Sequence, residues 1–91
     1  MSKPVLIDFY TKWCGPCRMQ TPIIEELEKL FGDRVEFKKV DADVDSDLAA
    51  RYSVFVIPTI VIENDGIEIK RYLGVTSKEE LEMVLMDAMK S

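Results

Sequence analysis

The apolar residues near the start of the chain form one nearly continuous run, Val5 to Tyr10 (VLIDFY), which only Asp8 interrupts. A run of this length is typical of a strand that is covered on both faces of a parallel or mixed sheet. The pattern therefore predicts a buried central strand over residues 5–10.

The segment after Cys14 is predicted to be a helix, because apolar residues recur in it at helical spacing with charged residues between them. These apolar residues are Ile23, Ile24, Leu27, Leu30 and Phe31. Gly32-Asp33 is expected to end the helix. Pro22 lies inside it, so we expect a kink there.

A strand and a short helix are predicted in the middle of the chain. Val35 to Val40 (VEFKKV) alternates apolar and charged residues, which is typical of a half-exposed strand. Asp45 or Ser46 can cap a short helix over Asp47 to Tyr52, where acidic residues favour the positive end of the helix.

The next segment is predicted to be an antiparallel hairpin. Thr59 to Ile62 is a β-branched run, and the turn Asn64-Asp65-Gly66 leads from it into Ile67 to Tyr72.

The final segment is predicted to be a helix that opens with a capping box, Ser77 to Glu80. Its apolar face consists of Leu81, Val84, Leu85, Ala88 and Met89. The other methionines considered, Met19, Met83 and Met86, are interpreted as packing residues too.

The predicted order of elements is β-α-β-α-β-β-α, in one domain that spans residues 1–91. A β-α-β crossover followed by a hairpin gives a four-stranded mixed sheet with helices on both faces. The sequence thus predicts a three-layer α/β/α fold.

Composition and charge narrow the chemistry. The 91 residues include no histidine, which excludes Ser-His and Cys-His nucleophile pairs and the commonest metal ligand. The net charge of −5 disfavours nucleic acid as a partner. The start of the chain is too short and too charged for a signal peptide, and no apolar stretch has the length of a membrane span. We therefore expect a cytoplasmic monomer that does not bind membranes.

The candidate chemistry lies in Trp13-Cys14-Gly15-Pro16-Cys17, between the first strand and the first helix. The backbone N–H groups and the dipole at a helix N-terminus favour a thiolate, so Cys14 is expected to be nucleophilic near neutral pH. Cys17, one helical turn further on, lies within reach to close a disulfide. Gly15 permits close approach of a substrate backbone, and Pro16 fixes a dihedral in the first turn.

The C-x-x-C spacing alone leaves alternatives open. Half of a zinc site has the same spacing, but a tetrahedral site needs four ligands. This chain has only two cysteines and no histidine, so it would have to dimerise or use carboxylates. An inert buried pair is the other alternative. Redox exchange is favoured over both, with no metal and no bound cofactor.

The motif W-C-G-P-C after V-L-I-D-F-Y, with I-P-T at 57–59 and Gly74 after the hairpin, resembles the thioredoxin family. The resemblance runs from Val5 to the final helix. It implies a thioredoxin-like fold and a dithiol-disulfide oxidoreductase that reduces protein disulfides. Its implied partners are disulfide-containing proteins and an electron donor, either a thioredoxin reductase or a small-thiol system.

Asp8 is the unusual residue of the first strand, because alternation places its carboxylate beside Leu6 and Tyr10 in an otherwise apolar strand. Burial there would raise its pKa, whereas an aspartate at the strand end could reach solvent instead. Asp8 matches the family's buried aspartate, which is thought to act as general base toward the second cysteine. Lys39 matches a nearby family lysine; its parity places it on the inward face, and a surface lysine is the alternative.

The resemblance also implies a substrate groove. Pro58 matches the family's cis-proline facing the disulfide, and Ile57 offers backbone hydrogen bonds to an extended substrate; an ordinary proline at the start of a strand is the alternative. Trp13 is expected to shield one side of the thiol and to form part of an apolar docking surface. Gly74 matches a glycine that leaves room for the substrate, or is a plain turn glycine.

The chain departs from the family pattern in three places. Only thirteen residues precede Cys14, so the extra N-terminal strand and helix of longer thioredoxins are expected to be missing. That length keeps open a glutaredoxin-like enzyme that draws electrons from glutathione or another small thiol. Tyr10 stands where many members have Trp. Val56 stands where many have Gly, and its side chain is expected to narrow the groove.

Overall fold

A computed structural model describes residues 3–90. Its elements follow the predicted order. They are β1 (Val5–Tyr10), α1 (Gly15–Phe31), a 3₁₀ turn η1 (Gly32–Arg34), β2 (Glu36–Asp41), α2 (Ser46–Arg51), β3 (Thr59–Asn64), β4 (Ile67–Leu73) and α3 (Lys78–Met89).

The four strands form one mixed sheet in the order β2-β1-β3-β4. β1 pairs in parallel with β2 and antiparallel with β3, and β3 pairs antiparallel with β4. The prediction of a buried central strand is confirmed, because β1 lies inside the sheet and residues 6–9 of it are buried.

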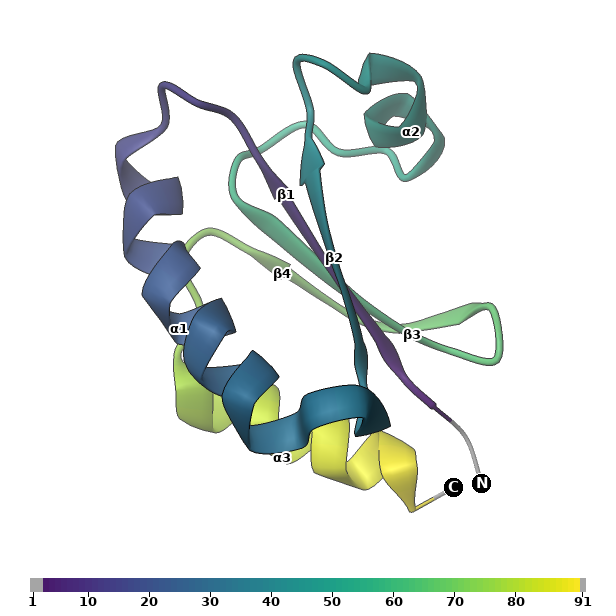
Figure 1. Ribbon diagram of the computed structural model, residues 1–91. Helices are drawn as coiled ribbons and strands as arrows, with labels where there is room; N and C mark the ends of the chain where they lie inside the picture. The colour runs from purple at the N-terminus through teal and green to yellow at the C-terminus, as the bar shows by residue number, and fades with distance from the viewer. Residues whose placement is uncertain (1–2, 91) are drawn as a thin grey trace.

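The helices cover both faces of the sheet (Figure 1): α1 and α3 lie on one side and α2 on the other. The larger core lies on the side of α1 and α3 and contains Leu6, Ile24, Leu27, Phe31, Val35, Ile60, Ile62, Leu81 and Leu85. The smaller core contains Ile7, Phe9, Ala49 and Val61. The three-layer prediction is therefore confirmed, and alternation along β1 places Asp8 on the same side as Leu6.

α1 begins and ends where its caps dictate. Pro16 stands in its first turn, where a missing N–H costs nothing. Gly32 ends it with a positive φ of 58°, as the sequence predicted. The helix continues through Pro22. The kink expected at that residue stays a prediction.

β2 and α2 are each shifted by one residue from their predicted bounds, and β3 and β4 continue past their predicted ends, to Asn64 and Leu73. β2 runs from Glu36 to Asp41, because the pairing with β1 sets its ends and the alternation of side chains does not. α2 begins at Ser46 because Asp45 is its N-cap, and the Asp45 carboxylate accepts from the Leu48 N–H at 3.3 Å.

The capping box before α3 is half formed. The Ser77 hydroxyl accepts from the Glu80 N–H at 3.2 Å, as predicted. The Glu80 carboxylate does not return the bond to Ser77 but accepts from the Tyr72 hydroxyl of β4 at 3.0 Å. Glu80 thus connects the first turn of α3 to β4 of the sheet.

The prediction that the methionines pack is wrong for three of them. Met19, Met83 and Met86 have 65%, 60% and 46% of their surface exposed. They lie on the outward faces of α1 and α3, while Met89 packs against the larger core. The thioether is tolerated in both settings, so residue type alone does not indicate burial.

Candidate redox site

Cys14 is the N-cap residue of α1. Its backbone is extended, with φ −107° and ψ 111°, and its sulfur accepts the Cys17 N–H at 3.2 Å. The sulfur therefore occupies the place of a capping oxygen, where a backbone donor and the positive end of the helix dipole both favour negative charge. This placement supports the expectation of a reactive thiolate at Cys14.

The two cysteines form a disulfide, with their Cα atoms 5.2 Å apart. They differ in accessibility: Cys14 is partly exposed, whereas Cys17 is buried with 4% of its surface exposed. A large partner can therefore reach the Cys14 sulfur first. Among residues 3–90, no group of three or more Cys, His, Asp or Glu side chains is arranged to hold a metal ion.

Asp8 is buried within β1, with 3% of its surface exposed. Its Oδ1 has no hydrogen-bond partner within residues 3–90. Burial raises the pKa of Asp8 to about 6, and the positive charge of Lys39 opposes that rise. The alternative of an aspartate that reaches solvent is thereby excluded.

Lys39 lies opposite Asp8 in the pairing of β2 with β1. Its side chain is 40% exposed, and its Nζ lies 3.3 Å from the Glu28 carboxylate of α1. Lys39 therefore lies on the side of the sheet that its parity predicted. The prediction that it faces inward is wrong, because its side chain is at the surface. β2 is an edge strand, and a long lysine stem there reaches solvent beside α1.

The Ile57–Pro58 peptide bond is cis, as the resemblance implied. Pro58 is buried and its carbonyl accepts from the Gly74 N–H at 2.8 Å, which joins the start of β3 to the end of β4. The Thr59 hydroxyl donates to the Val56 carbonyl across the same turn. Ile57 is half-buried.

Gly74 adopts φ +89°, a conformation that favours glycine. A Cβ built on it would meet no atom within 4 Å, and the same holds for Gly15. Space beside both residues is open in the free protein. The conformation alone accounts for Gly74 as a turn residue, so a role in making room for substrate needs its own test.

Large apolar side chains are exposed on the loops that lead to the disulfide and to the cis-proline. Trp13 is 87% exposed, and its role in docking stays a prediction. Phe55 is 90% exposed and Val56 45%, and sequence reasoning missed Phe55. A signal for it exists: Phe55 lies in an apolar segment before Ile57 that has neither strand nor helix periodicity.

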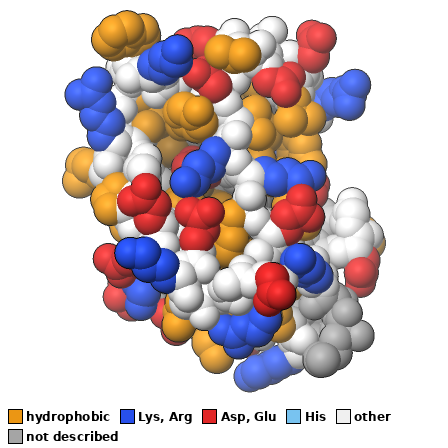
Figure 2. Space-filling model, in the orientation of Figure 1, with side chains coloured by type: hydrophobic (Ala, Val, Ile, Leu, Met, Phe, Trp, Pro, Cys, Tyr) orange, Lys and Arg blue, Asp and Glu red, His pale blue; other side chains and the backbone are white. Residues whose placement is uncertain are grey.

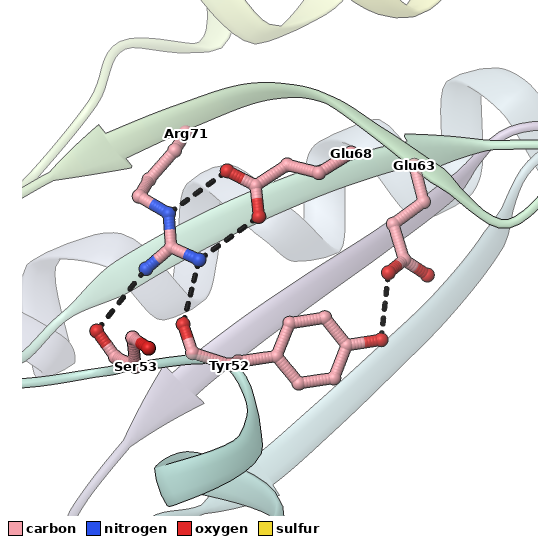
Figure 3. Close-up of polar contacts among 5 residues, drawn as sticks. All are labelled: Tyr52, Ser53, Glu63, Glu68 and Arg71. Atoms are coloured by element: carbon pink, nitrogen blue, oxygen red, sulfur yellow. Dashed lines mark hydrogen bonds and ion pairs between the residues drawn. The ribbon is translucent and has the colours of Figure 1, made fainter.

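A polar network anchors the segment that leads to Phe55 (Figure 3). The Arg71 guanidinium of β4 pairs with both Glu68 oxygens, each at 2.9 Å. The guanidinium also donates to the carbonyls of Tyr52 at 2.6 Å and Ser53 at 3.4 Å. The Tyr52 hydroxyl donates to Glu63 at 2.7 Å, and this bond is the main cause that raises the pKa of Tyr52 to about 12.

Side chains of both charges are mixed on the face of the molecule that Figure 2 draws. Figure 2 shows Lys and Arg interspersed with Asp and Glu over the face that α1 presents, with hydrophobic side chains among them. None of the helices in residues 3–90 combines the length and the hydrophobicity that a membrane-spanning helix needs.

Comparisons with known proteins identify the family of this chain. The family profile described as thioredoxin matches residues 1–87. Thioredoxin from Mycolicibacterium smegmatis is 42% identical over 90 residues, which cover 97% of this chain and 80% of that protein. The X-ray structure of Fasciola hepatica thioredoxin has a TM-score of 0.86 and 38% identity, and covers 94% of this chain and 81% of its own.

A further solved structure concerns the thiol resolving mechanism in yeast mitochondrial 1-Cys peroxiredoxin via glutathione/thioredoxin systems. It has a TM-score of 0.84 and 35% identity, and covers 93% of this chain and 78% of its own. With a family match over nearly the whole chain and a disulfide in the C-x-x-C motif, this chain belongs to the thioredoxin family and is a thiol-disulfide oxidoreductase, a protein-disulfide reductase.

Proposed function

We propose that Cys14 is the attacking nucleophile and Cys17 the resolving thiol of a cycle that reduces protein disulfides. The observation that carries this assignment is the position of the Cys14 sulfur as N-cap of α1 while Cys17 is buried behind it. The helix N-terminus stabilises a thiolate at Cys14, whereas burial shields the sulfur of Cys17 from a large partner.

The cycle balances as a two-electron exchange. The Cys14 thiolate attacks one sulfur of the substrate disulfide; that bond breaks, a mixed disulfide forms, and the other substrate sulfur leaves as a thiolate. The Cys17 thiolate then attacks the Cys14 sulfur, which closes the Cys14–Cys17 disulfide and releases the second substrate thiolate. The substrate gains the two electrons that the dithiol loses.

Asp8 is proposed as the general base that takes the proton of Cys17, through water. It lies on the α1 side of the sheet, and its pKa of about 6 leaves most of the carboxylate ionised at pH 7. Lys39 would assist from the surface, because its charge lowers the pKa of Asp8 and favours the ionised base.

The groove residues are proposed to position an extended substrate strand. Ile57 and Pro58 would face the disulfide, with backbone groups of Ile57 pairing with the substrate. Trp13 and Gly74 would flank the strand. Gly15 and Pro16, both exposed in the first turn of α1, would allow its close approach.

The cysteine roles are tested by trapping. Cys17→Ser, incubated with a disulfide-containing protein, should accumulate a mixed disulfide through Cys14 that is visible by mass, whereas Cys14→Ser should form none. Equal yields from both variants, or an adduct only in Cys14→Ser, would overturn the assignment. Cys14→Ser should also abolish turnover.

We further propose that the chain acts as one domain in the cytoplasm and recovers its electrons from a thioredoxin reductase or a small-thiol system. Peroxiredoxin disulfides are one candidate substrate class, because a similar structure concerns peroxiredoxin resolution. The reduction potential of the Cys14–Cys17 couple distinguishes the donors. A value near about −270 mV indicates a general reductant that needs a strong donor, and one near about −200 mV indicates the glutaredoxin-like alternative.

A further inference from the structure

Gln20 is a fully buried amide on the core-facing side of α1, one turn after Cys17. Its side chain makes two hydrogen bonds with one backbone unit. Nε2 donates to the Thr76 carbonyl at 3.0 Å, and Oε1 accepts from the Thr76 N–H at 2.7 Å. The amide therefore pairs with Thr76 as a strand residue would pair with its neighbour.

Thr76 lies in the loop between β4 and α3, beside Gly74. Its hydroxyl donates to the Gly74 carbonyl at 3.2 Å, and the Gly74 N–H donates to the Pro58 carbonyl at 2.8 Å. Hydrogen bonds thus run from the helix that carries Cys17, through Gln20, to the cis-proline. The two sides of the proposed groove are connected by this path.

The helical pattern predicts an apolar residue at position 20, because Gln20 shares its helix face with Ile24, Leu27 and Phe31, all of which are buried. An apolar side chain would pack there without any polar group to satisfy. The amide stabilises the protein only while both of its ends are bonded, so it specifies one position of the loop relative to α1.

We propose that Gln20 is a positioning residue for protein substrates: it holds the 74–76 loop at a fixed place relative to the disulfide and Pro58, and so sets the geometry of the groove. The inference rests on the proposed function of that groove and adds to it a residue that acts through its hydrogen bonds to Thr76. A small-molecule disulfide needs access only to the Cys14 sulfur, so its rate of reduction should not depend on the position of the 74–76 loop.

The test is Gln20→Leu, which keeps a side chain of similar size and removes both hydrogen bonds. We expect kcat/KM for a protein disulfide such as that of insulin to fall about tenfold, mainly through a higher KM. A tenfold change is about what the loss of one to two ordinary hydrogen bonds corresponds to. Reduction of a small aromatic disulfide should change by less than about twofold, because that reaction needs no groove.

Asn64→Leu is the matched control, since Asn64 is also buried and its Nδ2 donates to the Ala88 carbonyl at 3.1 Å, at the opposite end of β3. We expect it to lower the urea midpoint as Gln20→Leu does and to leave both rates unchanged. If the two variants behave alike, or if Gln20→Leu slows both substrates equally, the positioning role is wrong.

Gln20→Glu supplies a second test that does not rely on a core leucine. In its protonated form the introduced carboxyl can donate to the Thr76 carbonyl, whereas the carboxylate faces that carbonyl without a donor. Protein-disulfide turnover relative to wild type should therefore recover as the pH falls, while small-disulfide turnover relative to wild type stays flat; parallel profiles would overturn the proposal. Failure of wild type on both substrates would instead refute the proposed function.

Discussion

Asp8 and Lys39 are direct partners in the parallel pairing of β1 with β2, yet the ammonium group of Lys39 forms its ion pair with Glu28, at 3.3 Å. The lysine charge lies close enough to act on Asp8 but is shared with a second carboxylate. The Asp8 carboxyl is therefore governed by its burial, which raises its pKa to about 6 against an ordinary value of 3.8.

Asp8→Asn should remove a pH dependence of stability. Because the folded protein holds the Asp8 proton more tightly than the unfolded chain, the native state loses stability as the pH rises from about 4 to about 6. The difference between 3.8 and about 6 corresponds to roughly 3 kcal/mol. Relative to wild type, the variant should gain about 2 to 3 kcal/mol between pH 4 and pH 8 in urea unfolding.

The same variant tests the role of Asp8 in chemistry. Without the carboxylate, attack of Cys17 on the mixed disulfide should slow at pH 7, while formation of the mixed disulfide by Cys14 continues at the wild-type rate. Rapid-quench measurement of both steps separates them. Equal resolving rates in Asp8→Asn and wild type would count against the base, and a stability difference independent of pH would count against the raised pKa.

Lys39→Met should move the Asp8 titration upward. The lysine charge lowers the pKa of Asp8, so its removal raises that pKa further above 6 and shifts the pH profile of the resolving step to higher pH. Lys38→Met is the matched control, because Lys38 is the neighbouring lysine on the other face of β2 and pairs with Glu36 at 3.8 Å. Carbon-detected NMR titration of the Asp8 carboxyl gives the shift directly, and identical titrations in the two variants would exclude Lys39.

The elements of this fold were predictable because each rests on a local signal that tertiary contacts reinforce. The run at residues 5–10, the cap at Ser77 and the spacing of Ile24, Leu27 and Phe31 each act within a few residues. The redox pair was predictable for the same reason, since a helix start and a C-x-x-C motif coincide.

The positions of Lys39 and Gln20 were not predictable in the same way. The depth of Lys39 depends on β2 being the edge strand beside α1, which alternation within one strand does not encode. The role of Gln20 depends on a partner 56 residues away. In the sequence, Gln20 stands out only as a polar residue within an apolar helical stripe. That pattern indicates the position but does not identify Thr76 as its hydrogen-bond partner.

Gly74→Ala should separate the two interpretations of this glycine. The φ of +89° makes any side chain costly, about 1 kcal/mol, although a Cβ meets no atom in the free protein. Gly66, in the β3–β4 turn with φ +77° and open space around it, carries the same cost far from the groove. Both alanine variants should lose similar stability in urea.

If Gly74 makes room for substrate, only Gly74→Ala should raise KM for a protein disulfide, by several-fold. Steady-state kinetics on both variants decides the point. A KM change shared with Gly66→Ala would leave Gly74 as a turn glycine.

Val56→Gly should open the groove if the valine narrows it. Val56 is 45% exposed immediately before the Ile57–Pro58 pair, so its side chain stands beside the proposed substrate path. Truncation should raise kcat/KM for protein disulfides several-fold and leave a small disulfide unaffected, at a stability cost of about 1 kcal/mol from the freer backbone. Unchanged turnover of protein disulfides would remove the hypothesis.

Arg71 should anchor the segment before Phe55 through the planar shape of its guanidinium group as well as through its charge. Its planar guanidinium holds both Glu68 oxygens while it donates to the Tyr52 carbonyl at 2.6 Å, at the C-terminal end of α2. A lysine ammonium keeps the charge near that helix end but cannot match the fork. Arg71→Lys should therefore lower the free energy of unfolding by about 1 kcal/mol, and Arg71→Met by somewhat more because it also loses the favourable cation.

The neighbouring Lys70→Met serves as the charge control, since Lys70 is exposed and contacts the Tyr72 ring. We expect it to leave stability within about 0.5 kcal/mol of wild type. Amide hydrogen exchange distinguishes anchoring from general stabilisation: in Arg71→Lys, protection should fall first at Ser53 and Val54, ahead of the core strands. Uniform loss of protection, or stability equal to that of wild type, would show that Glu68 and Arg71 form only a surface ion pair.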